Sequence, residues 1–370
     1  MRRIRVLMVL GDFGLAGAES YVMNILRNID YSLFQVDLAV TKIAKGALYD
    51  EICSYGCEIF YLPQFKVFNI IKCYRFWKSF FRQEHFDIIH GHASNSAAVY
   101  LRAAKKCGIK TIVHSHSAGY RGGLFERSAK SLFARRAKNY ADMWCACSEK
   151  AAQRLFGSSY VNNPKYIELP NAINTDSFLF SDQIRKNIRE KYDIKEDVKV
   201  YGHVGSFSYP KNHTFIIDIF NIIQKKDKNA KLLLCGDGIL KKEIESKVAE
   251  LNIDGSVIFA GIVTNVNEYL MAMDALVFPS HFEGLPVSIV EAQATGLPVL
   301  MSDSITKEVI VTNIVKTKSL KSSASDWADS LLETKVDCRE RYNKVVGDTY
   351  FNMRTSIQQI MSIYNSLACK

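Results

Sequence analysis

The sequence predicts an α/β protein made of two doubly wound domains, and three observations lead to this fold. Short apolar or β-branched runs alternate with helix-like stretches, which is typical of a parallel sheet covered by helices on both faces. The alternation pauses once, over the turn-rich segment at residues 171–181, and then resumes. The 370 residues, of which 48% are hydrophobic, are enough for two domains of ordinary size.

The first series of strands and helices lies before the pause. Strands are expected at Ile4–Leu10, Phe34–Thr41, Cys57–Leu62, Phe86–His90, Thr111–His114, Met143–Cys147 and Tyr166–Leu169. Helices are expected at Ala18–Asn28, Ile70–Arg82 and Ser96–Cys107. We therefore assign residues 1–175 to the first domain, with the connection to the second domain near residues 171–181.

The second series has the same architecture. Its strands are expected at Val198–Val204, Lys231–Cys235, Val257–Ala260, Ala275–Pro279, Pro298–Met301 and Ile314–Thr317. Helices fit at Asn212–Lys225, Leu240–Leu251, Val266–Met273 and Pro286–Ala294. The second domain is thus expected at residues 176–348. Residues 349–370 form a last helix, whose apolar stripe must be buried against another element.

Composition excludes several classes of protein. No apolar run reaches the roughly 18–20 residues of a membrane span, and the apolar start reads as a first buried strand rather than a signal peptide. The nine cysteines are irregularly spaced, without the partners that a metal site or a disulfide framework needs. These features predict a reduced, cytoplasmic protein.

The formal net charge of +10 is concentrated in the first half, between residues 60 and 140. A basic surface of this kind favours an anionic partner: nucleic acid, anionic lipid or a phosphorylated substrate. No zinc-finger spacing, helix-turn-helix or RNA-binding motif accompanies the charge, so nucleic acid is not expected.

The most informative segment is FPSHFEGLPVSIVEAQATGLPVLMSDS, residues 278–304. A strand ends, a glycine loop follows, and a helix starts near Pro286, where proline suits the first turn. Ligands of open α/β sheets bind beyond the carboxyl ends of strands, so this loop is a candidate site. Free N–H groups near Gly284 and the helix dipole could hold a phosphate. Glu291 has apolar neighbours, and an ionised carboxylate there needs hydrogen-bond donors such as sugar hydroxyls.

Glu283 and Glu291 lie eight residues apart, with Gly-Leu-Pro directly after Glu283 and Gly-Leu-Pro-Val five residues after Glu291. This arrangement resembles the motif of the family 4 (group 1) retaining glycosyltransferases. The likeness is strongest over residues 200–305 and favours the capsule, exopolysaccharide and lipopolysaccharide members. It implies the GT-B fold, with two Rossmann-like domains facing across a cleft and the last helix returning to the first domain.

By this resemblance, Glu291 binds the ribose of the donor nucleotide and Glu283 holds the donor sugar. The backbone N–H groups of Gly284, Leu285 and Val287 face the diphosphate. No cofactor or metal is implied besides the nucleotide-sugar co-substrate, and UDP is favoured over GDP because it is the more frequent carrier in the family.

A second site is expected in Gly202–His213, GHVGSFSYPKNH. Lys211 precedes a helix, where its charge can neutralise a diphosphate leaving group. The family usually has arginine after the glycine of this turn, whereas this chain has Ser206 after Gly205. Ser206 offers only one neutral hydrogen bond, which raises the alternative of a weakened enzyme or a non-catalytic binding protein.

The first domain supplies two further candidates. Gly17 belongs to GLAGAES, residues 14–20, which resembles the family's glycine-rich first loop near the donor phosphates and acceptor.

The second candidate is a group of four histidines, which lie in pairs at the ends of two expected strands: His90, His92, His114 and His116. Histidine pairs of this kind can bind metals, but no acidic or cysteine ligand accompanies them, so no metal is expected here. By the resemblance, His116 contacts the donor sugar or the transition state, and His114 could be a satisfied core residue.

Together these residues predict a retaining transferase that moves a sugar to a saccharide or lipid-linked saccharide in cell-surface polysaccharide biosynthesis. Its transition state is oxocarbenium-like. By the resemblance, the acceptor attacks from the face from which the leaving group departs, and the leaving-group phosphate takes the acceptor's proton. A GT-B-type sugar-nucleotide epimerase is the alternative enzyme.

Acceptor or membrane contacts are expected on the basic half. The segment 65–82 mixes aromatic and basic residues, including Lys66, Lys72 and Arg75. It reads either as an interfacial helix on an anionic membrane at the inner face of the plasma membrane or as an ordinary helix with a solvated basic face. Arg121 lies in a glycine-containing basic segment that could form an acceptor loop.

Overall fold

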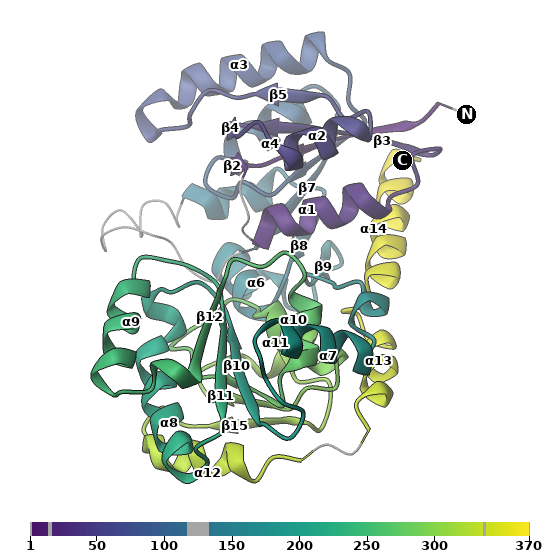
Figure 1. The fold of residues 1–370 in the computed structure, drawn as a ribbon. Helices are drawn as coiled ribbons and strands as arrows, with labels where there is room; N and C mark the ends of the chain where they lie inside the picture. The colour runs from purple at the N-terminus through teal and green to yellow at the C-terminus, as the bar shows by residue number, and fades with distance from the viewer. Residues whose placement is uncertain (1, 14–16, 117–132, 336–337, 370) are drawn as a thin grey trace. The chain divides into compact units, whose positions relative to one another are not determined.

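The computed structural model describes residues 2–13, 17–116, 133–335 and 338–369. The chain forms two compact units (Figure 1). The first comprises residues 1–172 and 353–370, and the second comprises residues 173–352. The boundaries expected after residues 175 and 348 lie within a few residues of these positions.

A seven-stranded parallel sheet forms the centre of the first unit, in the order β5-β3-β1-β6-β7-β8-β9. The strands are β1 (Ile4–Val9), β3 (Phe34–Val40), β5 (Ile59–Tyr61), β6 (Ile88–Gly91), β7 (Lys110–Ser115), β8 (Met143–Ala146) and β9 (Tyr166–Glu168). All seven coincide with expected strands. A separate two-stranded sheet of β2 (Asp12–Phe13) and β4 (Lys42–Ile43) was not expected, because two residues are too short to show a period.

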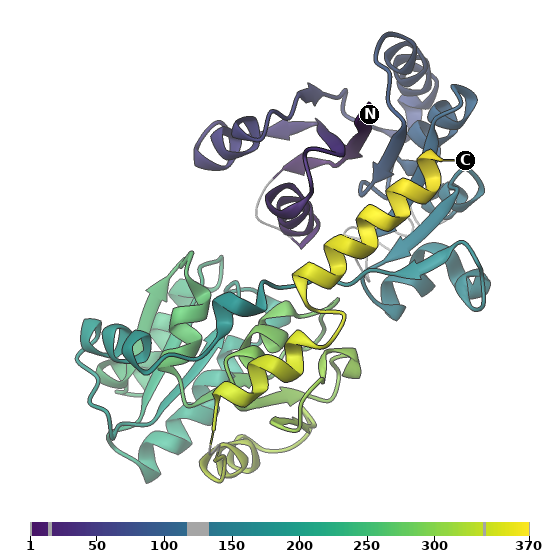
Figure 2. The same ribbon diagram turned by 90° about the vertical axis from the view of Figure 1, so that its right-hand side faces the viewer.

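Helices cover both faces of this sheet because successive side chains of a strand point in opposite directions. In β1, Val6 and Met8 belong to one core, whereas Leu7 and Val9 belong to the other. The first core contains residues of α1 (Gly17–Asn28), α2 (Ala47–Ser54) and α14 (Met353–Ala368). The second contains residues of α3 (Ile70–Gln83), α4 (Ala97–Lys106) and α6 (Glu149–Phe156). Figure 2 shows α14 in yellow, running back along the first unit.

The second unit has a six-stranded parallel sheet in the order β12-β11-β10-β13-β14-β15. Its strands are β10 (Val200–Val204), β11 (Lys231–Cys235), β12 (Val257–Gly261), β13 (Ala275–Phe278), β14 (Val299–Ser302) and β15 (Val315–Lys318). Residues of α7 (Asp182–Lys191), α10 (Val266–Ala272), α11 (Val287–Ala294) and α13 (Glu340–Gly347) contribute to one core. Residues of α8 (His213–Lys226), α9 (Lys241–Glu250) and α12 (Ala324–Leu332) contribute to the other.

Asp274, at the start of β13, fixes α7 to this sheet. It accepts hydrogen bonds from Arg185 at 2.7 Å and from Arg189 at 2.8 Å. Burial opposes its ionisation, but the two guanidinium groups outweigh that effect and hold the pKa of Asp274 below its usual value. This network lies at the amino end of the strand and leaves the carboxyl end free for a site.

Strand order reverses once in each sheet, next to the strand that begins the series. The reversal lies between β1 and β6 in the first unit and between β10 and β13 in the second. Neighbouring loops leave the sheet in opposite directions at such a point, and the crevice beyond the carboxyl ends is where ligands of doubly wound sheets bind. Among the described residues, no helix is both long and apolar enough to span a membrane.

Candidate functional site

The loops that follow β10 and β13 meet at the reversal point of the second unit. The β10 loop ends in a single 3-10 turn, η5 (Tyr209–Lys211), directly before α8. His281 N donates to Pro210 O at 2.8 Å, and Asn212 Nδ2 donates to Pro279 O at 3.1 Å. Asn212 has φ of 57°, in the left-handed region that asparagine tolerates, which turns the chain sharply into α8. Two loops about 70 residues apart are thus joined into one surface.

Lys211 and Glu283 form an ion pair on this surface. Their Nζ and Oε1 atoms are 2.8 Å apart, and their side chains retain 18% and 14% of their exposure. Lys211 Nζ also lies 5.0 Å from the centroid of the Phe278 ring. The two groups are close enough for an ion pair, but their angles do not make a hydrogen bond. Glu283 Oε1 therefore has no hydrogen-bond partner among the described residues. Both groups are therefore held in place and retain capacity to bind a polar ligand.

Glycines allow the β10 loop to pack this closely. A Cβ on Gly205 would lie 3.1 Å from Lys211 Cε, and a Cβ on Gly236 would lie 2.1 Å from Gly205 O. Gly236 also has φ of 144°, which disfavours any other residue. Ser206, next to Gly205, is exposed, and its Oγ lies 2.9 Å from Ser208 Oγ. Its side chain thus points into solvent-accessible space at the position where the family resemblance implies arginine.

Glu291 lies on α11, which starts one residue after Pro286. The Glu291 carboxylate takes part in no hydrogen bond or ion pair within the described part of the chain, although it is partly buried. Burial raises its pKa from 4.5 to about 7. No side chain caps the first turn of α11. A carboxylate without donors and uncapped helical N–H groups are both suited to a ligand that has hydroxyls and negative charge.

Two buried histidines lie beneath the β10 loop. His213 begins α8, its ring stacks on Phe207 at 4.1 Å between centroids, and neither ring nitrogen has a hydrogen-bond partner among the described residues. His203 Nδ1 bonds to Val277 O at 2.9 Å. Burial, followed by the charge of Lys211, lowers the pKa of His213 to about 4. Both imidazoles are therefore neutral at pH 7, so Lys211 is the local cation.

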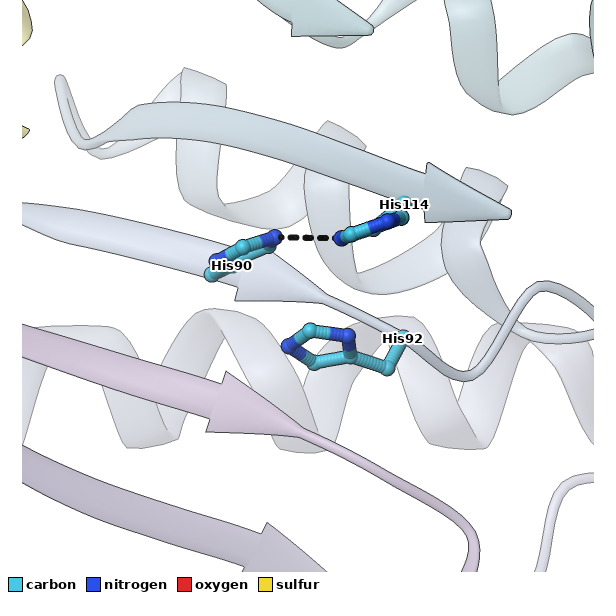
Figure 3. A group of neighbouring side chains, drawn as sticks. All are labelled: His90, His92 and His114. Atoms are coloured by element: carbon cyan, nitrogen blue, oxygen red, sulfur yellow. Dashed lines mark hydrogen bonds between the residues drawn. The ribbon is translucent and has the colours of Figure 1, made fainter. Parts of the chain in front are cut away.

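The first unit brings the four expected histidines together at the carboxyl ends of β6 and β7. His90 Nε2 lies 3.3 Å from His114 Nδ1, and His92 Nδ1 lies 2.7 Å from His116 Nε2. His114 also bonds through Nε2 to Leu169 O at 3.2 Å, so it is the satisfied core residue that its apolar strand suggested. Figure 3 shows His90, His92 and His114 converging from the two strand ends.

His116 is the most exposed of the four. Its Nδ1 has no hydrogen-bond geometry to any described residue, although the Asn171 side chain lies near enough to influence its pKa. Burial lowers the pKa of His116 to about 3. Asn171 Nδ2 in turn donates to the carbonyl of Gly17 at 3.5 Å, at the start of α1. Gly17, His116 and Asn171 therefore lie in one neighbourhood, while Gly14–Ala16 of the expected loop fall outside the described residues.

A cavity of about 490 Å³ opens at the reversal point of the first unit. Its lining combines aromatic and polar side chains with the start of α4 and with His92, whose Nε2 has no hydrogen-bond partner among the described residues. The lining includes Gln64, Phe65, Trp77, His92, Asn95 and Ser96.

The expected basic residues lie on the surface. Lys66 precedes α3, and Lys72 and Arg75 lie on its exposed side. The opposite side of α3 buries Cys73, Trp77 and Phe81 in the core. Arg121 falls outside the described residues.

Comparison with known proteins agrees with this geometry. The family model described as "Glycosyl transferases group 1" matches residues 184–343, and "Glycosyltransferase Family 4" matches residues 15–177. EpsF of Bacillus subtilis (strain 168), named as a glycosyltransferase, is 30% identical over 98% of this chain and 96% of its own. The chain belongs to the group 1 glycosyltransferases.

Two further proteins resemble this glycosyltransferase. The UDP-Gal:alpha-D-GlcNAc-diphosphoundecaprenol alpha-1,3-galactosyltransferase of Escherichia coli is 26% identical over 64% of this chain and 61% of its own. The crystal structure of Anabaena Alr3699/HepE in complex with UDP superposes with a TM-score of 0.81, covering 98% of this chain and all of that one, at 16% identity. This likeness shows that the fold is GT-B.

Several residues of these sites were not anticipated from the sequence of this glycosyltransferase. His203 and His213 lie within the expected segment 202–213, but neither residue belongs to a motif that indicates a role. Asn171 lies in the connecting segment, where nothing in the sequence points to a site. Tyr364 on α14 donates to or accepts from His90 Nδ1 at 2.8 Å, across 274 residues of sequence. The apolar stripe of the last helix was the only signal for it, and that stripe does not indicate which partner a tyrosine hydroxyl will have.

Proposed function

We propose that this glycosyltransferase transfers a sugar from a UDP-sugar to a saccharide or lipid-linked saccharide acceptor, with retention of configuration, in cell-surface polysaccharide biosynthesis. The observation that carries the proposal is the Lys211–Glu283 ion pair at the reversal point of the second sheet. It supplies a fixed cation for a leaving diphosphate and a fixed carboxylate for sugar hydroxyls.

In the proposed donor site, the ribose hydroxyls donate to Glu291 and the sugar hydroxyls donate to Glu283. The first-turn N–H groups of α11, together with those of Gly284 and Leu285, bind the diphosphate. Three features of the described residues support this arrangement: none of them donates a hydrogen bond to the carboxylate of Glu291, none caps α11 with its side chain, and a Cβ on Gly284 would meet no atom of theirs within 4 Å. The UDP bound to HepE supports the choice of nucleotide.

The proposed reaction breaks the bond between the anomeric carbon and the diphosphate oxygen and releases UDP. The acceptor oxygen bonds to the same face of the sugar, and its proton passes to the leaving phosphate. Negative charge grows on the diphosphate as the bond breaks, so a preorganised Lys211 stabilises the transition state more than the ground state. We place His116 near the donor sugar, where its neutral imidazole can hydrogen-bond without adding charge.

We assign acceptor binding to the 490 Å³ cavity of the first unit. Phe65 and Trp77 offer apolar faces for a sugar ring, and Gln64, Asn95 and Ser96 offer hydrogen bonds to its hydroxyls. The acceptor named for the Escherichia coli relative, a sugar on diphosphoundecaprenol, supports a lipid-linked substrate. The exposed basic side of α3 would then hold the protein at the anionic membrane in which such a lipid lies.

A transfer assay tests the proposal. The purified protein is incubated with single UDP-sugars and with short synthetic lipid-diphosphate saccharides, and the product is analysed by NMR for the configuration of the new linkage. An α-linked product from an α-linked donor supports retention, and an inverted product contradicts it. Isomerised sugar nucleotide formed without acceptor would instead support the epimerase alternative.

Ser206 favours one second candidate, a donor-binding protein with little turnover. Its exposed hydroxyl cannot replace the cationic side chain that the family resemblance implies at this position. The variant Ser206→Arg distinguishes the two functions. A large gain in rate would mean that the missing cation limits transfer, whereas an unchanged substantial rate would mean that Lys211 suffices.

A further inference from the structure

We propose that His90, His92 and His114 form a binding site for one divalent transition-metal ion of the zinc, cobalt and nickel class, with an open coordination position toward the cavity of the first unit. One ring nitrogen of each histidine lies within 4.8 Å of the others, and all three side chains are buried. The proposal is independent of the donor chemistry proposed above, in which no metal takes part.

The second nitrogen of each ring has an outer partner, as is usual for histidines that bind metals. His114 Nε2 faces the carbonyl of Leu169, which can only accept, so the Nε2 atom carries the proton and the lone pair is on Nδ1. His90 Nδ1 can donate to the Tyr364 hydroxyl in the same way. His92 Nδ1 can donate to His116 Nε2. With these tautomers, every outer N–H is satisfied. In the metal-free chain His90 Nε2 and His114 Nδ1 share a hydrogen bond at 3.3 Å, so one of them carries a proton that leaves when an ion binds to both nitrogens.

The remaining three nitrogens are those available to a metal: His90 Nε2, His92 Nε2 and His114 Nδ1. Two of them already lie 3.3 Å apart, close to the roughly 3.4 Å that two nitrogens on a tetrahedral zinc ion require. His92 Nε2 has no hydrogen-bond partner among the described residues, although its side chain is only 6% exposed. An unpaired nitrogen buried to this degree is costly unless a ligand satisfies it.

The approach to the site also fits. His92 lines the 490 Å³ cavity, so an ion can enter from there, and a water or substrate oxygen can complete its coordination. Three imidazoles with one open position are the ligand set of a catalytic zinc centre. The three ligand nitrogens lie within 4.8 Å of one another, so the rings must close in for every separation to reach the roughly 3.4 Å of a tetrahedral zinc ion. The sequence offered no acidic or cysteine ligand, but the outer partners Leu169, Tyr364 and His116 could be identified only in the folded chain.

Metal binding is tested on the full chain, free of any affinity tag, after removal of metals with a chelator. Exposed cysteines are first blocked with a thiol reagent, because Cys53, Cys338 and Cys369 could bind metal themselves. Cobalt(II) is then added, and its visible spectrum and stoichiometry are measured by titration and equilibrium dialysis. We expect one equivalent, with the intense visible bands of four-coordinate cobalt, that zinc displaces.

Variants locate the ion. His92→Ala should lose the visible bands and weaken binding at least tenfold, and Tyr364→Phe should weaken binding by about 10–100-fold through loss of an outer partner. His85→Ala, which removes an exposed histidine outside the cluster, should bind as the wild type does. Near-ultraviolet circular dichroism checks that each variant is folded.

Absence of cobalt binding by the folded wild type would overturn the proposal, and this outcome requires no variant. Equal binding by wild type and His92→Ala would also overturn it, because the ion would then lie elsewhere. A weak, six-coordinate spectrum shared by all variants would mean adventitious surface binding and would equally reject the site.

Discussion

At the scale of single residues, the proposed donor site contains a few charged groups in different electrostatic environments. Lys211 and Glu283 compensate each other's charge, whereas Glu291 has no partner in the described structure. Their charged atoms are held 2.8 Å apart in a partly shielded position. An unpaired carboxylate in a partly buried position is instead driven toward its neutral form. The two glutamates of one motif therefore have different physical roles.

Lys211→Ala should lower kcat by about 10²–10³-fold, because a preorganised charge that faces the leaving diphosphate would be lost. The measurement is steady-state transfer with saturating donor and acceptor. Lys242→Ala removes an exposed lysine of the same unit and should leave kcat unchanged. If both variants had the same rate as the wild type, Lys211 would have no part in departure of the diphosphate.

Glu291 predicts a dependence of stability on pH. Its folded-state pKa of about 7 exceeds the unfolded value of 4.5, so the folded state binds the extra proton between these pH values. Stability from this group is fully present below pH 4.5 and is lost as pH rises through 7. Glu291→Gln removes the titration and should stabilise the protein at pH 8, by at most about 3 kcal/mol, since the side chain keeps some contact with water.

Denaturant unfolding of wild type and Glu291→Gln at pH 8 and at pH 5 measures this effect without nucleotide. The difference between the two proteins should be larger at pH 8. A difference that is equal at both pH values would show that Glu291 does not titrate between them.

At the scale of elements, α3 has one side buried in the core and another side exposed to water. Its buried stripe of Cys73, Trp77 and Phe81 is required for the core. Its other side keeps Lys72 and Arg75 in water, beside Ile71 at 66% exposure and, just before the helix, Phe68 at 85%. Exposed apolar groups among cations are typical of helices that bind the surface of an anionic bilayer. The exposed side is consistent with either reading of this segment from the sequence, so binding to an anionic membrane stays a prediction.

Reversing charge on this side should weaken membrane binding. Each basic residue near an anionic surface contributes about 1 kcal/mol, so Lys72→Glu with Arg75→Glu should lower the partition coefficient at least tenfold. Co-sedimentation with vesicles that contain phosphatidylglycerol measures it. The control variant, Lys225→Glu with Lys228→Glu on the second unit, changes net charge equally at exposed positions. Equal losses in both double variants would mean that only total charge matters.

At the scale of the whole molecule, the chain leaves the first unit at residue 172 and returns to it at residue 353. Helix α14 completes the first core with Met353, Ile357, Ile360, Ile363 and Leu367. The stability of the first unit therefore depends on the last residues of the chain, whereas the second unit is built from one continuous segment.

Ile360→Ala should destabilise the first unit by about 2–5 kcal/mol, because Ile360 is only 1% exposed and the substitution leaves a cavity. Hydrogen exchange followed by mass spectrometry should show faster exchange in β1, β6 and α1, and unchanged exchange in β10 and β13. Gln358→Ala, at an exposed position of the same helix, is the control. Equal acceleration in both units would contradict the division of the chain.

The sheets could be predicted because strands buried on both faces read as short apolar runs, as in Leu232–Leu234 at the centre of β11. The motif around Glu283 and Glu291 predicted one loop of the proposed donor site. Contacts between distant segments could not be read in this way. The hydrogen bonds from Asn212 to Pro279 and between Tyr364 and His90 produce no pattern in the sequence, because each depends on how separate elements pack. The family resemblance suggested the return of the last helix, but not its hydroxyl contact with His90.

The most direct test of a donor site at the reversal point of the second sheet is isothermal titration of UDP into wild type, Glu291→Ala and Glu243→Ala. Glu243 is exposed on α9 and serves as the matched control. Wild type and Glu243→Ala should bind one UDP with the same Kd, and Glu291→Ala should bind at least tenfold more weakly, because the ribose hydroxyls lose their acceptor. Equal affinity in all three proteins would place the nucleotide elsewhere and contradict the proposed site.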